Sequence, residues 1–95
     1  MAQSFAAMNG LFLEDLKPGM SAMFGKTVTE ADIAGFAGVS GDTNPIHLHD
    51  GFARTTRFGQ RIAHGMLSGS FISTVIGTKL PGPGAVYISQ TMNFM

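Results

Sequence analysis

The sequence contains no cysteine, no tryptophan and only one tyrosine among its 95 residues. Without cysteine it forms no disulfides and carries out no thiolate chemistry, which fits a reducing compartment, and we expect a cytoplasmic protein. Charge is also sparse, because six basic and six acidic side chains give a formal net charge of zero. With no basic cluster, the sequence has no electrostatic footprint for nucleic acid or for an anionic membrane surface.

Glycine and methionine are abundant instead, with thirteen and seven residues. A chain of this length makes at most one domain with a small core, since it buries only about 60–68% of its unfolded surface. We therefore predict a single domain over residues 1–95. Adaptable methionine side chains suit the lining of a site for a flexible acyl chain, but methionine also fills ordinary hydrophobic cores.

Residues 63–80, AHGMLSGSFISTVIGTKL, predict a long helix that has no polar face. Its large apolar side chains recur at the helical period in several directions, and glycine, serine and threonine fill the gaps between them. A helix that is apolar or small on every side is typical of a buried helix. The polar interruptions argue against a membrane span, which needs roughly 20 predominantly apolar residues. We expect the rest of the chain to pack around this helix.

The other segments predict a mixture of helices and strands. Thr29 is a good N-cap for a helix over residues 30–39, and Glu30 and Asp32 place negative charge in its first turn. Alternating apolar side chains predict two strands, and one or two helical turns are expected between them. The strands are residues 21–28 and 85–95, the helical turns are residues 50–55, a short edge segment covers residues 11–16, and residues 1–10 form a loose leader.

The second predicted strand ends at Met95, and its apolar face is predicted to pack against the long helix. Two strands cannot surround a helix that is apolar on every side, because isolated two-stranded sheets are marginal at best. We therefore expect either that partner chains supply the remaining strands or that the sequence is truncated at its C-terminus.

The densest chemistry lies in residues 41–50, GDTNPIHLHD. A carboxylate, Asp42, and an imidazole, His47, are five residues apart on a loop stiffened by proline, so both can act on one water molecule. The alternative is structural, because Asp and Asn before proline are common turn formers. A further alternative is a metal site at His47, His49 and Asp50. Since two imidazoles are only a fragment of a chelate, we predict no metal.

The start of the long helix is a second candidate site. Gly65 offers the free amides and partial positive charge of a helix N-terminus, and it has no side chain to block access to them. The neighbouring His64 either lines a site there or caps the helix and fills space, and the sequence leaves both alternatives open.

Four segments together resemble the MaoC-like (R)-specific enoyl-CoA hydratases. They are FAGVSGDTNPIH at 36–47, TRFG at 56–59, IAHGML at 62–67 and LPGPG at 80–84. The resemblance covers roughly residues 29–94 and implies a dimer with a hotdog fold, in which an antiparallel sheet wraps the long helix. The expected fold class is α+β and hotdog-like, with a long buried central helix packed on an antiparallel sheet and the later strands missing from this chain.

The resemblance also implies an activity, the hydration of a trans-2-enoyl-CoA to the (R)-3-hydroxyacyl-CoA in fatty-acid oxidation or in polyhydroxyalkanoate (PHA) supply. Asp42 and His47 match the family's catalytic pair, and Gly65 matches the glycine whose amide donates to the oxyanion. Three further residues are expected to contact the substrate: Asn44, Ser73 and His64. No cofactor is implied beyond the coenzyme A of the substrate. The expected partners are the acyl-CoA thioester and a second copy of the chain.

Two alternative functions stay open. A hotdog thioesterase could use Asp42 and Gly65 for hydrolysis, although the Asp-x-Asn-x-x-His arrangement favours hydration. The other alternative is a truncated chain without catalytic activity that binds an acyl group or a partner subunit.

Overall fold

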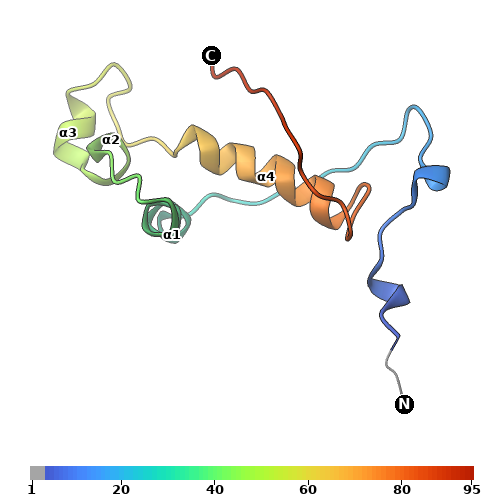
Figure 1. The fold of residues 1–95 in the computed structure, drawn as a ribbon. Coiled ribbons are helices and arrows are strands. Elements are labelled where there is room, and N and C mark those ends of the chain that lie inside the picture. Colours follow the sequence, from blue (N-terminus) through green and yellow to red (C-terminus); the bar gives the residue numbers. More distant parts are fainter. Residues whose placement is uncertain (1–3) are drawn as a thin grey trace. The chain divides into compact units, whose positions relative to one another are not determined.

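The computed structural model describes residues 4–95, and the regular structure in that range is helical (Figure 1). Two short 3-10 turns, η1 (Ala6–Met8) and η2 (Leu13–Asp15), precede the α-helices. The helices are α1 (Glu30–Ser40), α2 (Pro45–Leu48), α3 (Asp50–Arg54) and α4 (Gly65–Thr78). Within the same range, no helix has the length and apolar character needed to cross a membrane.

Helix α1 begins at the predicted N-cap. The Thr29 hydroxyl accepts a hydrogen bond from the Asp32 amide at 3.2 Å, and the Asp32 carboxylate accepts one from the Thr29 amide at 2.9 Å, which makes a capping box. The Lys26 ammonium donates to the same carboxylate at 2.7 Å, and this hydrogen bond and that of the Thr29 amide lower the pKa of Asp32. Gly41 ends the helix at φ 76°, a left-handed conformation that glycine adopts without strain. The helix predicted at residues 30–39 is confirmed.

The structure has a helix, α2, where the sequence predicts only a loop. Pro45 occupies its first position, where the missing N–H is no loss, and the Asn44 side-chain oxygen accepts a hydrogen bond from the Ile46 amide at 3.1 Å. Asn44 itself is extended, with ψ 126°, as the following proline requires. A single turn is too short to show an apolar period, so the pattern does not reveal it.

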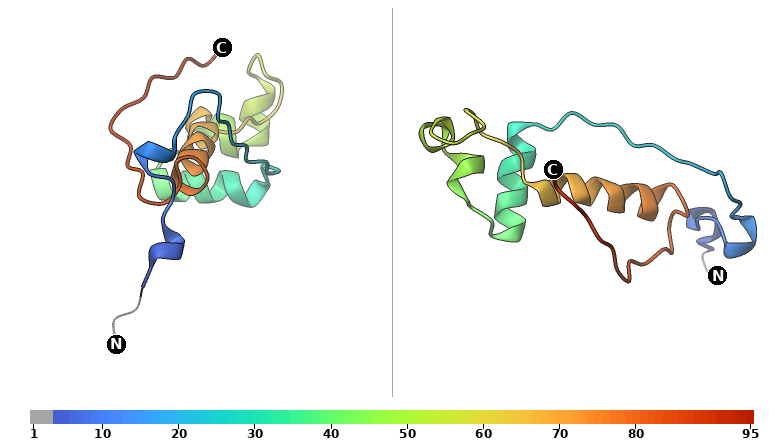
Figure 2. Two further views of the ribbon diagram at one scale, coloured as in Figure 1. Left: turned by 90° about the vertical axis from the view of Figure 1, so that its right-hand side faces the viewer. Right: turned by 90° about the horizontal axis from the view of Figure 1, so that it is seen from above.

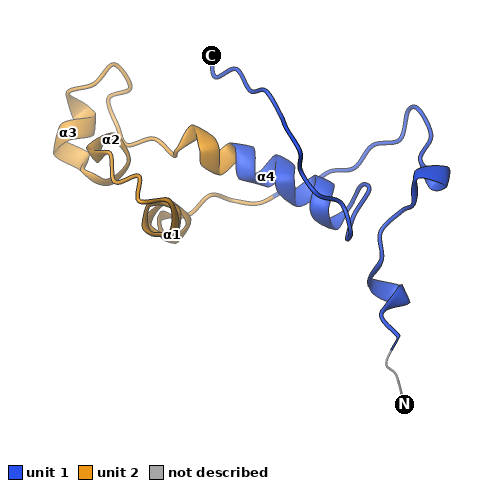
Figure 3. Ribbon diagram, in the orientation of Figure 1, with its two compact units in different colours: residues 1–25, 69–95 blue, residues 26–68 orange. Residues whose placement is uncertain are grey.

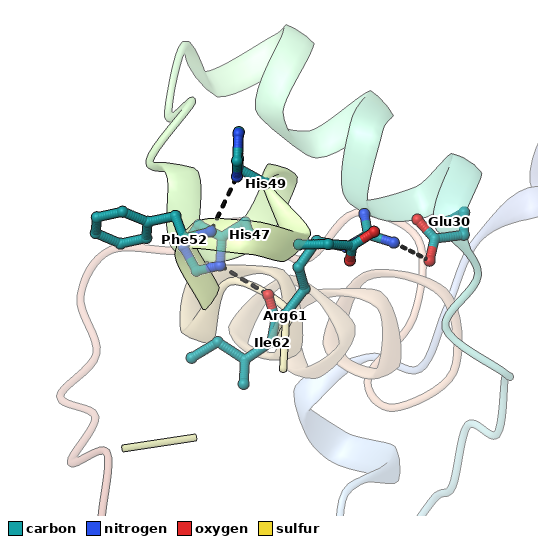
Figure 4. Close-up of polar contacts among 7 residues, drawn as sticks. Glu30, His47, His49, Phe52, Arg61 and Ile62 are labelled. Carbon is teal, nitrogen blue, oxygen red and sulfur yellow. Dashed lines mark hydrogen bonds and ion pairs between the residues drawn. The ribbon is translucent and has the colours of Figure 1, made fainter. Parts of the chain in front are cut away.

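Helix α3 follows α2 after one residue and confirms the helical turns predicted at residues 50–55. His49 is its N-cap, because its Nδ1 accepts a hydrogen bond from the Phe52 amide at 2.9 Å (Figure 4). A histidine nitrogen here does the work that a serine or aspartate oxygen does at most helix starts. His49 therefore has a structural role in the fold.

Helix α4 lies inside the range predicted for the long helix, 63–80, and is shorter by two residues at each end. The prediction that this helix is buried is wrong for the described residues. Leu67 is buried, but Met66 and Ile72 are 53% and 49% exposed. The apolar pattern correctly predicts a helix, but residues 4–95 leave part of its apolar surface exposed.

The predicted antiparallel sheet is not confirmed, because residues 4–95 contain no strand. The predicted strands at 21–28 and 85–95 have no regular secondary structure, and the predicted edge segment at 11–16 contains the turn η2. Alternating apolar residues indicate which face of a strand would be buried, but the strand forms only when a neighbouring backbone pairs with it. Val86 and Ile88 are 83% and 97% exposed, so the apolar face of the second segment is uncovered.

The described chain divides into two compact units (Figure 3). One unit, Lys26–Ser68, holds α1, α2, α3 and the start of α4, and the other combines Gly69–Met95 with the described residues up to Gly25. In the first unit α2 packs against α1 and α3, as the views of Figures 1 and 2 show. The buried side chains of this unit are Ala37, Ala53, Leu67, His47 and His64. Two histidines among them mark a polar region within the small core.

We expect the 95-residue chain to self-associate at micromolar concentration. Several large apolar side chains are exposed, among them Met66, Val86, Ile88 and Phe94, and exposed apolar surface favours association. Sedimentation velocity over a range of concentrations measures this. The double variant Val86→Glu/Ile88→Glu removes apolar surface without touching the buried residues and should shift the distribution toward monomer. A compact, cooperatively melting monomer of the unmodified chain would contradict the expectation.

Candidate active site

Asp42, His47 and His64 converge in the unit Lys26–Ser68, where one potential ligand atom from each side chain lies within 4.8 Å of those of the other two. Asp42 follows the C-cap of α1, His47 is the third residue of α2, and His64 directly precedes α4. His47 and His64 are 7% and 2% exposed, whereas Asp42 is exposed. The predicted proximity of Asp42 and His47 is confirmed. A solvent-accessible carboxylate beside a shielded imidazole can hold one water molecule between them.

One hydrogen bond fixes the tautomer of His47. Its Nδ1 lies 2.8 Å from the carbonyl oxygen of Ile62 (Figure 4). A carbonyl oxygen only accepts, so Nδ1 carries the proton, and the lone pair of the neutral ring is at Nε2. The amide of Ile62 donates in turn to the carbonyl of Ile46 at 3.3 Å. The connector before α4 is thus bonded to α2 through both the amide and the carbonyl of Ile62.

His64 supports the loop that carries the carboxylate. Its Nε2 donates to the backbone oxygen of Asp42 at 2.9 Å. Its ring stacks on that of His47 with 3.8 Å between the ring centroids, and the Phe36 ring contacts it edge-on with 4.8 Å between the centroids. These contacts favour the space-filling alternative for His64. Its Nδ1 is nevertheless buried without a hydrogen-bond partner, which leaves an unused acceptor beside the predicted pair.

The ring geometry does not favour a metal ion at this cluster. A metal lies in the plane of each imidazole that binds it, whereas the rings of His47 and His64 are stacked at an interplanar angle of 27°. One nitrogen of each ring is also already hydrogen-bonded to a backbone carbonyl oxygen. The alternative site at His47, His49 and Asp50 is not assembled either. His49 caps α3 through Nδ1, and the Asp50 carboxylate pairs with Arg61 at 2.6 Å.

Gly65 is the first residue of α4 and is exposed, as predicted. The N–H groups of a first helical turn have no acceptor within the helix, and they carry the positive end of the helix dipole. In α4 the Leu67 amide donates to the His64 carbonyl at 3.0 Å, so the Gly65 amide is the candidate donor of this turn. Because Gly65 follows His64 directly, this donor lies beside the cluster of Asp42, His47 and His64.

The two remaining predicted residues have different positions. Asn44 lies on the loop between Asp42 and His47. Its backbone amide donates to the Asp42 carboxylate at 3.3 Å, and its side-chain oxygen caps α2. Ser73 is an exposed residue of α4 in the other unit. The roles of both in substrate binding stay predictions.

An ion-pair network that the sequence does not predict lies beside the site. Arg61 donates from Nη2 to Glu30 at 2.7 Å (Figure 4). It also donates from Nε to Asp50 at 2.6 Å. The hydrogen bonds that Arg61 donates to Glu30 and, with a smaller effect, to Asp50 raise the pKa of its guanidinium. Glu30 and Asp50 each begin a helix, which is an expected place for negative charge, but nothing in the sequence indicates which cation they meet.

A comparison with protein families assigns the chain. The family model described as MaoC like domain matches residues 12–95. The chain belongs to the MaoC-like domain family. The resemblance found in the motifs around Asp42, His47 and Gly65 is therefore confirmed at the level of the family.

Known proteins similar to this MaoC-like chain include (R)-hydratases. It is 57% identical over 83 residues to the (R)-specific enoyl-CoA hydratase of Rhodospirillum rubrum, an alignment that covers 87% of this chain and 58% of that protein. The unliganded R-hydratase PhaJ1 of Pseudomonas aeruginosa is similar with a TM-score of 0.84 and 48% identity, over 90% of this chain and 56% of that one. The (R)-hydratase of Aeromonas caviae involved in PHA biosynthesis has a TM-score of 0.83 and 41% identity, over 86% of this chain and 62% of that one.

The MaoC-like chain thus spans somewhat more than half the length of these three relatives. The structural similarity supports the hotdog-like class in its coarse form. The sheet of that class is not among the elements of residues 4–95.

Proposed function

We propose that the protein hydrates trans-2-enoyl-CoA thioesters to (R)-3-hydroxyacyl-CoA. The observation that carries the proposal is the fixed ring of His47. Its Nδ1–H is committed to the Ile62 carbonyl, which leaves the lone pair of the neutral ring on Nε2. The same side chain lies in a cluster with Asp42 and His64 in which one ligand atom from each lies within 4.8 Å of the others. The similarity to (R)-specific enoyl-CoA hydratases supports the same reaction.

In the proposed reaction, Asp42 and His47 hold one water molecule on one face of the substrate. One of the pair removes a proton from this water as its oxygen bonds to C3, the C2–C3 double bond becomes single, and a proton is delivered to C2. The net change is addition of one water molecule. Imidazole is the side chain best suited to give and take a proton near neutral pH. Addition from a single water accounts for one stereochemical outcome.

The proposal gives Gly65 the role of oxyanion donor. As water adds, negative charge moves onto the thioester oxygen, and a fixed amide at the start of α4 stabilises it where it develops. The positive end of the helix dipole adds to this effect. Gly65 is exposed and lacks a side chain, so a carbonyl oxygen can approach its amide closely.

We assign supporting roles to three further residues. Asn44 holds the Asp42 carboxylate through its amide, and His64 holds the Asp42 backbone through Nε2, so both fix the loop that carries the acid. The unpartnered Nδ1 of His64 is an acceptor that bound substrate or water can meet. For Ser73 the proposal of substrate contact rests on the family resemblance.

The proposal also covers the oligomeric state, the compartment and the pathway. We infer a cytoplasmic homodimer that requires no cofactor other than the coenzyme A of its substrate and that works in fatty-acid oxidation or PHA supply. The sequence without cysteine fits a reducing compartment. The relative from Aeromonas caviae is involved in PHA biosynthesis, which supports the second pathway.

An assay with crotonyl-CoA tests the proposed function in the complete gene product. Hydration removes the ultraviolet absorbance of the conjugated enoyl thioester and releases no thiol, whereas a thioesterase releases free coenzyme A. We expect loss of absorbance without thiol release. Thiol release would assign the protein to the thioesterases, and tight binding with neither change would favour a non-catalytic acyl-binding chain.

A further inference from the structure

We propose that Arg61 is a positioning residue for His47. Its ion pairs with Glu30 and Asp50 fix the connector that presents the Ile62 carbonyl, and this carbonyl holds the proton of His47 on Nδ1. Arg61 thereby keeps Nε2 as the nitrogen that faces the reaction. The catalytic consequence rests on the proposed function, whereas the effect on the tautomer does not.

The first step is the attachment of Arg61 to two helices. Its Nη2 donates to the carboxylate of Glu30 at the start of α1 (Figure 4). Its Nε donates to a separate carboxylate, that of Asp50 at the start of α3. The planar guanidinium presents these donors in a fixed fork, which one ammonium group could not reproduce. The Arg61 side chain is only 25% exposed, although the two carboxylates are more open to water. A single exposed pair contributes little, but here one cation ties together two elements far apart in the chain.

The second step links Arg61 to the histidine ring through the backbone. Ile62 follows Arg61 directly, so a shift of the connector moves the Ile62 peptide. That peptide accepts from His47 at 2.8 Å and donates to the Ile46 carbonyl at 3.3 Å. The second of these bonds is long, so the backbone contact by itself holds the connector weakly. The strong charge-assisted pairs of Arg61 are then the main restraint on the acceptor of the His47 proton.

The experiment measures the tautomer and the kinetics of the same variants in the complete gene product. Nitrogen-15 shifts of the His47 ring report whether Nδ1 or Nε2 carries the proton. In the unmodified protein we expect the Nδ1–H form, and in Arg61→Ala a mixture with the Nε2–H form. The kcat should fall by about 10-fold, less than the 10²-fold that a misplacement of 1 Å can cost, while KM stays within about twofold.

Two further sets of variants separate positioning from folding. Arg57→Ala removes an arginine of the same segment that lies over the Phe58 ring, and it should change neither kcat nor the His47 shifts. Glu30→Gln/Asp50→Asn leaves Arg61 in place without the negative charges of its partners and should reproduce the effect of Arg61→Ala. Adding Arg61→Ala to this double variant should then cost little more.

The tautomer decides the inference independently of the proposed activity. If Arg61→Ala or Glu30→Gln/Asp50→Asn is folded by circular dichroism and keeps His47 in the Nδ1–H form, the positioning role is wrong. If the unmodified protein does not hydrate crotonyl-CoA but the tautomer changes as expected, the proposed function fails and the positioning role stands. If Arg61→Ala loses helical signal in circular dichroism, the His47 tautomer in Glu30→Gln/Asp50→Asn tests the inference instead.

Discussion

Asp42→Ala and His47→Ala should each lower kcat for hydration of crotonyl-CoA by about 10²- to 10⁴-fold, the range that general acid–base groups contribute. The two side chains lie in one cluster of ligand atoms within 4.8 Å, and His47 has its free nitrogen at Nε2. If they act on a single water molecule, removal of either group already abolishes its activation. The double variant should therefore lose little more than the worse single variant, because residues that act as a unit are not additive.

The matched control for this pair is His49→Ala. His49 is two residues from His47, but its Nδ1 caps α3 and takes no part in the cluster. Loss of a cap costs about 0.5–2 kcal/mol of stability, so this variant should melt earlier while kcat stays close to that of the unmodified protein. Full activity of either Asp42→Ala or His47→Ala would return the Asp-Asn-Pro turn to a purely structural role. Strictly multiplicative losses would mean that the two residues act independently.

Gly65→Pro should lower kcat by about 10²- to 10³-fold, the usual cost of one oxyanion donor. Proline at this position removes the amide hydrogen that we assign to the thioester oxygen. Gly65 is the first residue of α4, where proline is tolerated because its missing N–H has no partner within the helix. Circular dichroism should therefore show unchanged helix content, and steady-state kinetics should place the loss in kcat.

Gly65→Ala is the control that keeps the amide. It adds only a methyl group at the start of α4, so it should retain much more activity than Gly65→Pro. Equal losses in both variants would assign the effect to side-chain bulk and contradict the donor role. Unchanged turnover in Gly65→Pro would remove the oxyanion assignment altogether.

The helices could be predicted because their signals are local. The capping box of α1 joins Thr29 to Asp32, three residues apart, and the pattern of α4 repeats within its own length. The hydrogen bonds of a helix likewise connect residues four apart, so a short stretch contains all that the helix requires. The single turn of α2 escaped prediction because four residues show no period.

The strands and the burial of α4 could not be predicted in the same way. A strand forms by pairing with another backbone, and the alternation in residues 85–95 does not show whether that backbone is present. Val86 and Ile88 remain exposed, and α4 keeps Met66 and Ile72 open to solvent. The apolar pattern indicates which surface of a helix or strand is apolar. Whether that surface is buried depends on residues that are distant in sequence.

In the candidate site, too, contacts between residues close in sequence could be predicted and contacts between distant residues could not. Asp42 and His47 are close in sequence, so their proximity followed from a short rigid loop and from the family motif. The groups that orient His47 are distant, since Ile62 is 15 residues from it and Arg61 pairs with residues 11 and 31 positions away. Only the folded structure brings these groups together. The Arg61 network is therefore a property that the sequence does not reveal.

The most direct test of a single water held by Asp42 and His47 is the stereochemistry of hydration in D₂O. The complete gene product is allowed to hydrate crotonyl-CoA, and the configurations at C2 and C3 of the product are determined by NMR. Because both groups act from one face, we expect the (R)-3-hydroxy product with deuterium at C2 added on the same face as the oxygen. A product with deuterium on the opposite face, or with a mixed configuration at C2, would contradict the account.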